Sequence, residues 1–367
     1  MSPNKQMNPQ SWLSKNGNPF IISGPCSAET EEQVMDTAQA IAKSGRVNAL
    51  RAGIWKPRTR PNSFEGMGAI ALPWLKNAAV ESGLKSITEV AKPQHVERCL
   101  KEGIDMLWIG ARTTANPFSV QEIAEALKGV DIPVFVKNPI HLDLQLWIGA
   151  MERLWHAGIT RIGAIHRGFA VGKPNRYRNQ PLWEIPIELK RLYPNLILLS
   201  DPSHISGNRD HIERLSQRAL DLDFDGLMIE SHNQPDKALS DAAQQVTPDQ
   251  LNDILSRLKY RRSSSANQEF VHNLQTLRGE IDELDEELLH LLKKRIEIVE
   301  YIGDFKLKNN VTVFQLERWI EILKTRGDLA IELGIDKEFI VEMMKTIHKE
   351  SVRIQTELNK KHKIEQS

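Results

Sequence analysis

Short apolar segments recur along residues 1–260, and a helix-like segment follows each of them. Their hydrophobicity is continuous rather than alternating, which indicates burial on both faces, as in a parallel sheet covered by helices. Eight such units in about 250 residues are typical of a (β/α)8 barrel. An open doubly wound sheet is the alternative, because the number of strands alone does not prove closure. The expected strands are Phe20–Ser23, Val47–Leu50, Leu84–Thr88, Met106–Ile109, Pro133–Val136, Arg161–Ile165, Leu196–Ser200 and Gly226–Glu230, with crossover helices at Glu31–Lys43, Gln94–Glu102 and Ser119–Leu127 among others.

A change of pattern predicts a second, smaller all-α domain at residues 269–367. It follows a predicted flexible linker at residues 261–268 and contains no proline. Apolar residues repeat there at steps of three and four, the heptad pattern of a long helix that dimerises. Two further helices are expected at Gln315–Arg326 and Lys337–Asn359. The seam of the long helix comprises Leu274, Leu277, Ile281, Leu284, Leu288 and Leu291, and continues at Ile298, Ile302 and Phe305.

One seam position, Arg295, carries a charge where the heptad pattern demands an apolar residue. A buried guanidinium without a partner is costly, so Arg295 is expected to have an anionic partner such as a bound dicarboxylate. The simpler alternative for this domain is a solvated dimerisation module that binds no ligand.

Composition narrows the class of protein further. The 48 basic and 48 acidic residues cancel, so no overall field draws the chain to nucleic acid or to an anionic membrane. No apolar run approaches the roughly 20 residues of a membrane span, and residues 1–18 lack the apolar core of a signal peptide. With only two cysteines, Cys26 and Cys99, the chain is expected to be a cytoplasmic protein without disulfides.

Cations concentrate where the predicted strands end. In a (β/α)8 barrel the active residues lie at the C-terminal ends of the strands and on the loops that follow. Arginine forks and lysine ammonium groups at such positions bind phosphate and carboxylate. An isolated Lys-Pro-Arg-Thr loop would be only a solvated basic turn, but further cations at other strand ends indicate an anion site. Two of the cations, Lys56 and Arg58, belong to the Lys-Pro-Arg-Thr loop. The others are Arg51, Arg112, Lys137 and Arg167.

Candidate metal ligands form a second group at the same strand ends. They are Cys26, His204, Glu230 and Asp241, a thiol, an imidazole and two carboxylates. Such a mixed set suits a divalent transition metal, with Mn2+ as the first choice and Fe2+, Zn2+ and Co2+ as alternatives. Each residue alone is weak evidence of a metal, because single cysteines and histidines are commonly structural. Strands 1, 7 and 8 bring the four together only if the barrel closes.

Residues 1–260 resemble the 3-deoxy-D-arabino-heptulosonate 7-phosphate (DAHP) synthases of type I beta. That resemblance implies a metal-dependent condensation of phosphoenolpyruvate with erythrose 4-phosphate. Sibling synthases that build other sugar acids share the barrel but lack Lys-Pro-Arg-Thr, which favours erythrose 4-phosphate as the acceptor. The matching segments are Gly-Pro-Cys-Ser-Ala-Glu (24–29), Arg51 with Lys-Pro-Arg-Thr (56–59), Ile-Thr-Glu-Val (87–90), Ile-Gly-Ala-Arg (109–112), Lys137, His-Arg-Gly (166–168), Asp-Pro-Ser-His (201–204), Glu230 and Ala-Leu-Ser-Asp (238–241).

The resemblance also implies a role for each cation. Arg112 and Arg167 would hold the phosphate of phosphoenolpyruvate, and Arg51, Lys56 and Lys137 its carboxylate. Arg58 and Thr59 would hold the phosphate of erythrose 4-phosphate. The expected catalytic side chains are Lys56, Lys137 and His204, and either lysine is able to protonate the developing alkoxide.

The helical region carries Leu277-Arg278, Leu284-Asp285-Glu286 with Leu288-Leu289, Arg295, Lys306, Arg318, and Ser351 with Gln355. With this spacing, residues 269–367 resemble the all-helical chorismate mutases, in which two intertwined chains share their active sites. The resemblance implies that Arg295 and Arg318 bind the two carboxylates of chorismate, helped by Arg278 of the partner chain. Lys306 and Gln355 would contact the ether oxygen, and Ser351 would complete the site. Gln315 and Trp319 depart from the family, which has acidic residues there; the one matching Trp319 helps to bind the substrate hydroxyl.

We therefore expect a bifunctional enzyme of the shikimate pathway that is at least a dimer. The fusion and its serine-rich linker suggest feedback inhibition of the synthase through the helical domain by prephenate, the mutase product. The alternative is a synthase whose helical tail only senses prephenate and dimerises. A phosphate-binding protein without catalysis is disfavoured by the four metal-type ligands.

Overall fold

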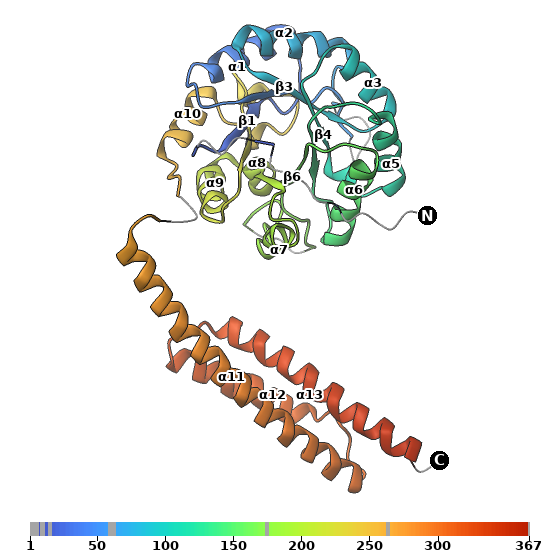
Figure 1. Cartoon of the computed structure of the whole chain (residues 1–367), viewed down its shortest axis with the longest axis vertical. Helices are drawn as coiled ribbons and strands as arrows, with labels where there is room; N and C mark the ends of the chain where they lie inside the picture. The colour runs from blue at the N-terminus through green and yellow to red at the C-terminus, as the bar shows by residue number, and fades with distance from the viewer. Residues whose placement is uncertain are drawn as a thin grey trace. The chain divides into compact units, whose positions relative to one another are not determined.

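The computed structural model describes residues 7, 12–13, 17–57, 64–172, 176–261 and 265–365. The chain divides into two compact units, Met1–Ser263 and Ser264–Ser367. Figure 1 shows parallel strands surrounded by helices in the first unit and long helices in the second.

Eight parallel strands in the first unit close into a barrel in sequence order, with β1 paired to both β2 and β8. Closure confirms the predicted (β/α)8 architecture and excludes an open sheet. The second strand lies slightly later in the chain than expected, so that Arg51 ends the strand instead of following it. The strands are β1 Phe20–Gly24, β2 Ala49–Arg51, β3 Lys85–Val90, β4 Met106–Ile109, β5 Val134–Lys137, β6 Ile162–His166, β7 Ile197–Ser200 and β8 Gly226–Glu230.

Helices cover the outer face of the barrel, as the continuous hydrophobicity of the strands requires. Local signals set their ends: α10, for example, begins with a capping box in which Thr247 and Gln250 satisfy each other's backbone N–H groups, and Pro248 follows the cap. The covering helices are α1 Glu31–Ala42, α2 Leu72–Ser82, α3 Pro93–Lys101, α5 Pro117–Ala126, α6 Leu144–His156, α7 Glu184–Leu192, α9 Ile212–Asp221 and α10 Pro248–Arg257, with the short helices α4 Ala111–Thr114 and α8 Pro202–Ser206 after β4 and β7.

Alternate residues of the strands pack on opposite faces. Ile21 and Leu107 belong to the core between sheet and helices, whereas Ile22 and Trp108 belong to a second core inside the barrel. Trp12 packs against this inner core and donates from Nε1 to the carbonyl of Ile162, the first residue of β6. The N-terminal end of the barrel is thereby filled, and the C-terminal end is left for polar side chains.

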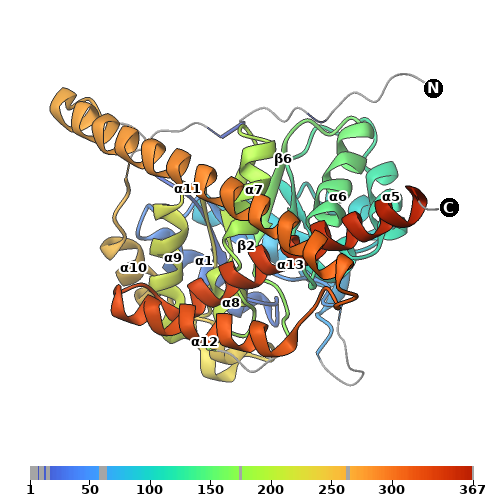
Figure 2. The same cartoon turned by 90° about the horizontal axis from the view of Figure 1, so that it is seen from below.

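Three helices form the second unit: α11 Gln268–Lys308, α12 Leu316–Glu332 and α13 Lys337–Glu365. The predicted helix at Gln315–Arg326 was too short, because Gly327 does not end it. Gly327 instead lets α12 approach Lys337 and Val341 of α13 closely. Within this unit α13 packs against the C-terminal half of α11 and α12 packs against α13, whereas the N-terminal half of α11 extends beyond them (Figure 2).

Candidate active sites

The C-terminal end of the barrel collects most of the residues that the sequence analysis selected. Arg51, Lys137 and Glu230 are the last residues of β2, β5 and β8, and each is almost fully buried. Cys26 follows β1, and His204 lies on α8 after β7. Arg58 and Thr59 lie outside the described residues.

The Cys26 thiol lies in a cluster of opposite charges. Its Sγ is 3.3 Å from Asp241 Oδ2 and 2.5 Å from Lys56 Nζ, and Lys56 Nζ is 3.6 Å from the same Asp241 oxygen. Burial and the nearby carboxylate of Glu230 raise the pKa of the thiol to about 12 although Lys56 opposes the shift. Cys26 is therefore protonated unless a stronger cation than an ammonium group binds it.

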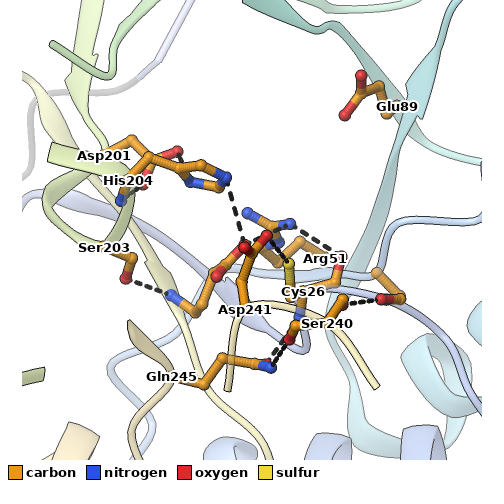
Figure 3. Close-up of polar contacts among 12 residues, drawn as sticks. Cys26, Arg51, Glu89, Asp201, Ser203, His204, Ser240, Asp241 and Gln245 are labelled. Carbon is orange, nitrogen blue, oxygen red and sulfur yellow. Dashed lines mark hydrogen bonds and ion pairs between the residues drawn. The ribbon is translucent and has the colours of Figure 1, made fainter. Parts of the chain in front are cut away.

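Glu230 and His204 form the other half of this cluster. Glu230 Oε1 lies 3.1 Å from Arg51 Nη2 and 3.7 Å from His204 Nε2. Burial alone would raise the pKa of Glu230, but the charges of His204, Arg51 and other cations outweigh it and lower the pKa. Figure 3 shows Cys26, Arg51, His204 and Asp241 pointing toward one another. The four predicted metal ligands thus meet as two pairs, Cys26 with Asp241 and His204 with Glu230.

No group of three His, Cys, Asp or Glu side chains among the described residues has the arrangement of a metal site. The donor chemistry nevertheless fits a divalent transition metal, because a thiol, an imidazole and two carboxylates approach one another in a buried place. Lys56 lies among these donors, which indicates that they attract positive charge.

The buried carboxylate of Asp201 lies between Lys137 and His204 and is paired with both. Lys137 Nζ lies 2.7 Å and His204 Nδ1 2.8 Å from Asp201 Oδ2. Burial would raise the pKa of Asp201, but the charges of His204 and Lys137 hold it well below its ordinary value. The ionised Asp201 therefore orients both neighbours, with the Nε2 atom of His204 facing Glu230.

Arg167 belongs to a group of arginines above β6. Burial lowers its pKa to about 10 against the opposing effect of Asp201, and the charges of Arg178 and Arg112 add to the lowering. Like charges held this close favour the binding of an anion among them. Arg167 Nη1 donates to Asn179 Oδ1 (2.7 Å), and Asn179 Nδ2 donates to the carbonyl of His204 (2.6 Å). Asn179 therefore links the arginine group to the candidate metal ligands.

The helical unit holds a second polar site between α11 and α13. Arg295 Nη1 donates to Ser351 Oγ (2.7 Å), and Gln355 is buried against Gly303. Lys306 Nζ donates to the carbonyl of Val313 (2.6 Å). Arg295 is half-buried, and a bound dicarboxylate as its anionic partner stays a prediction. Arg318 pairs with Glu321 on the exposed surface of α12, and Arg278 is exposed on the N-terminal half of α11.

Comparison with known protein families identifies both domains. The model of the DAHP synthetase I family matches residues 6–265. The chain belongs to this family. The chorismate mutase type II model matches residues 277–356, so a chorismate mutase domain follows the DAHP synthase barrel. The chain thus combines a transferase domain and an isomerase domain, as its sequence predicted.

Individual relatives agree with the family of the barrel. The chain is 32% identical over 244 residues to the phospho-2-dehydro-3-deoxyheptonate aldolase of Thermotoga maritima, a match that covers 66% of this chain and 70% of that protein. It is 27% identical over 257 residues to the 2-dehydro-3-deoxyphosphooctonate aldolase of Nitratidesulfovibrio vulgaris strain DP4, covering 65% and 90%. The crystal structure of the Thermotoga maritima DAHP synthase is similar with a TM-score of 0.60 and 30% identity, covering 66% of this chain and 68% of that chain.

Several polar residues of the DAHP synthase barrel were absent from the predicted site. Asp201 and Asn179 act as described above, and Arg178 Nη1 lies 3.1 Å from Asp241 Oδ1. Gln244 Nε2 donates to Glu230 Oε2 (2.8 Å), and Gln245 Oε1 accepts from the backbone N–H of Cys26 (2.9 Å). The one available signal was Asp201, which stands in the Asp-Pro-Ser-His segment; the others lie in loops without a recognisable pattern.

Among the described residues, no helix combines the length and the apolar character that crossing a membrane requires.

Proposed function

We propose that the barrel condenses phosphoenolpyruvate with erythrose 4-phosphate to DAHP in a metal-dependent reaction. The observation that carries the proposal is the meeting of buried cations and metal-type donors at one end of the barrel. Arg51, Lys56 and Lys137 lie near the candidate metal donors, and the arginines around Arg167 form a separate cationic group. A substrate with a carboxylate and a phosphate at opposite ends requires two such groups.

The two cationic groups would hold phosphoenolpyruvate by both ends. Arg51, Lys56 and Lys137 would bind its carboxylate, and Arg112 and Arg167 its phosphate. Trp108 supports the carboxylate group, since its ring lies 4.9 Å from Arg51 Cζ and 5.6 Å from Lys137 Nζ. Arg58 and Thr59 would bind the phosphate of erythrose 4-phosphate.

Cys26, His204, Glu230 and Asp241 would hold the divalent metal, Mn2+ in the first instance. When bound, the metal supplies a Lewis acid that polarises the aldehyde of erythrose 4-phosphate. Gln244, Gln245 and Arg178 support these ligands through the hydrogen bonds described above, and Asp201 fixes the ring of His204 so that Nε2 faces the site.

The condensation joins the enol carbon of phosphoenolpyruvate to the aldehyde carbon, after which water adds and phosphate leaves by carbon–oxygen cleavage. The aldehyde oxygen must gain a proton, and Lys56 and Lys137 are the candidate donors. Separate Lys56→Met and Lys137→Met variants distinguish them. We expect Lys137→Met to abolish turnover, and an active Lys137→Met variant would exclude this residue. Lys190→Met is the matched control, because Lys190 makes a similar ion pair with Asp225 (2.8 Å) at the start of β7 and β8.

The direct test of the synthase is the consumption of phosphoenolpyruvate on addition of erythrose 4-phosphate, with and without a chelator. Consumption of phosphoenolpyruvate that requires both the aldehyde and the metal would support the proposed synthase reaction. Arabinose 5-phosphate as the competing acceptor tests the choice of sugar. No consumption with erythrose 4-phosphate in metal-replete buffer would reject that acceptor, and consumption after thorough chelation would reject the metal.

The helical domain is proposed to rearrange chorismate to prephenate. Arg295 and Arg318 would bind the carboxylates, and Lys306 and Gln355 the ether oxygen, which gains negative charge as its bond breaks. Gln355 is buried on α13 against Gly303 of α11, and its side-chain amide N–H2 group is the donor that the ether oxygen requires. Conversion of chorismate by the full chain tests the proposal. Arg295→Ala should abolish it, whereas Arg353→Ala on the exposed face of α13 should not.

Pairing of two chains through α11 is part of the same proposal. The side chains of Leu277, Ile281, Leu284, Leu288 and Leu291 are 49–63% exposed in the single chain, although their heptad pattern is that of a buried seam. A second copy of α11 would cover them and bring its Arg278 to the mutase site.

Feedback control is the remaining part of the proposal. Prephenate bound at the helical domain would lower the synthase rate, which requires that it bind two states of the enzyme unequally. If prephenate slows the synthase in a chain without mutase turnover, the helical domain is only a sensing and dimerising module. A synthase rate that is independent of prephenate would reject feedback.

A further inference from the structure

His348 extends the polar face of α13 toward the candidate mutase site. It stands three residues before Ser351 and seven before Gln355, a spacing that places the three side chains on one face of a helix. Ser351 accepts the hydrogen bond from Arg295, and Gln355 packs against Gly303 of α11. The face of α13 that carries His348 is therefore the face that lines the site.

Two aromatic residues fix the imidazole ring of His348. The Trp319 ring is stacked on it, with centroids 4.0 Å apart and planes 14° apart, and the Phe314 ring meets it edge-on at 5.9 Å. The Nε2 atom of His348 is buried, yet it has no hydrogen-bond partner among the described residues. A buried polar atom in a ring that is held in place is suited to a ligand with a complementary group.

The electrostatic surroundings keep this imidazole neutral. Burial lowers the pKa of His348, and the positive charges of Arg295 and Lys306 lower it further. A neutral imidazole between two cations is a hydrogen-bonding group for an uncharged polar atom rather than a third binding group for a carboxylate.

Chorismate carries one such atom. Its polar groups are two carboxylates, an ether oxygen and a ring hydroxyl. The arginines suit the carboxylates, and Lys306 with Gln355 suits the ether oxygen, so that the hydroxyl alone lacks a partner. We propose that Nε2 of His348 binds the ring hydroxyl of chorismate and that Trp319 positions the imidazole by stacking. The inference rests on the proposed mutase function and adds the residues that determine recognition of the hydroxyl.

The test compares chorismate with the analogue in which hydrogen replaces the ring hydroxyl, using the full chain. His348→Phe keeps an aromatic ring against Trp319 and removes the nitrogen. We expect it to lower kcat/KM for chorismate by about 10- to 100-fold, the usual effect of losing one buried hydrogen bond to a substrate. The analogue should react equally well with the wild-type chain and with His348→Phe. Both His348→Gln, which restores a hydrogen-bonding group, and the control His272→Phe should retain discrimination between the two substrates.

Trp319 is tested as a positioning residue by Trp319→Phe and Trp319→Leu. The first preserves stacking and should keep most of the preference for the hydroxyl, whereas the second should lose it together with the affinity for chorismate. An equal loss on both substrates in His348→Phe would overturn the proposal, because it would show a structural role. An unchanged rate with chorismate would overturn it as well. Failure of the wild-type chain to convert chorismate would instead reject the mutase function itself.

Discussion

Replacing Asn179 with alanine should uncouple the arginine group around Arg167 from the candidate metal ligands. Asn179 is 5% exposed and makes two buried hydrogen bonds, one from the guanidinium of Arg167 and one to the carbonyl of His204. A neutral hydrogen bond contributes about 1 kcal/mol, and one that involves a charged group about 1.5–3 kcal/mol. The loss therefore amounts to about 2.5–4 kcal/mol, shared between fold stability and the binding of phosphoenolpyruvate.

The part of this loss that affects binding should weaken the contacts to the phosphate of phosphoenolpyruvate. Released from Asn179, the Arg167 side chain keeps, among the described residues, a longer bond to the carbonyl of Gly168 (3.3 Å) and loses its fixed orientation. We expect the KM for phosphoenolpyruvate to rise at least about 10-fold, since a tenfold change corresponds to about 1.4 kcal/mol. The KM for erythrose 4-phosphate should change little. Asn179→Asp should bind phosphoenolpyruvate still more weakly, because its carboxylate would compete with the phosphate for Arg167.

Steady-state rates with each substrate varied in turn supply the measurement, together with thermal denaturation of each variant. Asn116→Ala is the matched control: Asn116 also accepts two hydrogen bonds, from the N–H groups of Phe118 and Ser119, but it caps α5 on the surface. It should lower the melting temperature without changing either KM. If Asn179→Ala leaves the KM for phosphoenolpyruvate within about twofold of wild type, or raises that for erythrose 4-phosphate instead, the link between Asn179 and the phosphate group is wrong.

Three further predictions concern a buried histidine, the exposed seam of α11 and a close backbone contact in the barrel. Burial lowers the pKa of His166 to about 3, below its value of 6.5 in the unfolded chain. The unfolded state therefore binds more protons between those values, and the free energy of unfolding should fall as the pH falls through that range, less steeply in His166→Phe. Leu284→Glu should give a monomer by sedimentation, with the mutase lost and the synthase retained. Gly226→Ala should destabilise the barrel in chemical denaturation, because its Cβ would overlap the carbonyl of Phe20 in β1; an unchanged midpoint would contradict this.

The barrel was predictable because its strands are buried on both faces. Such strands show continuous apolar runs, and a parallel sheet places all their C-terminal ends together, so Arg51, Lys137 and Glu230 were identifiable from position alone. Closure, which brings Cys26 next to Glu230, was not predictable from the number of strands. It follows from the pairing of β1 with β8.

The sequence analysis missed several residues that support or extend the two candidate sites. Asn179 and Gln244 lie in loops, where no periodicity marks a side chain that turns inward. His348 stands on a helix whose other polar residues are largely solvated, and only the stacked Trp319 distinguishes it. Trp319 was recognised as a departure from the family. The role proposed for it depends on its stacking against His348 of α13, which the spacing of residues does not reveal.

If two chains pair through the exposed face of α11, the synthase and mutase activities should depend differently on protein concentration. All the described residues of the barrel site come from one chain, so the synthase should turn over at any dilution. A mutase site that needs Arg278 of a second chain exists only while two chains remain together. Dilution below the dissociation constant of the pair would then lower the specific activity of the mutase alone. The ratio of the two rates, followed against enzyme concentration, becomes a direct readout of assembly.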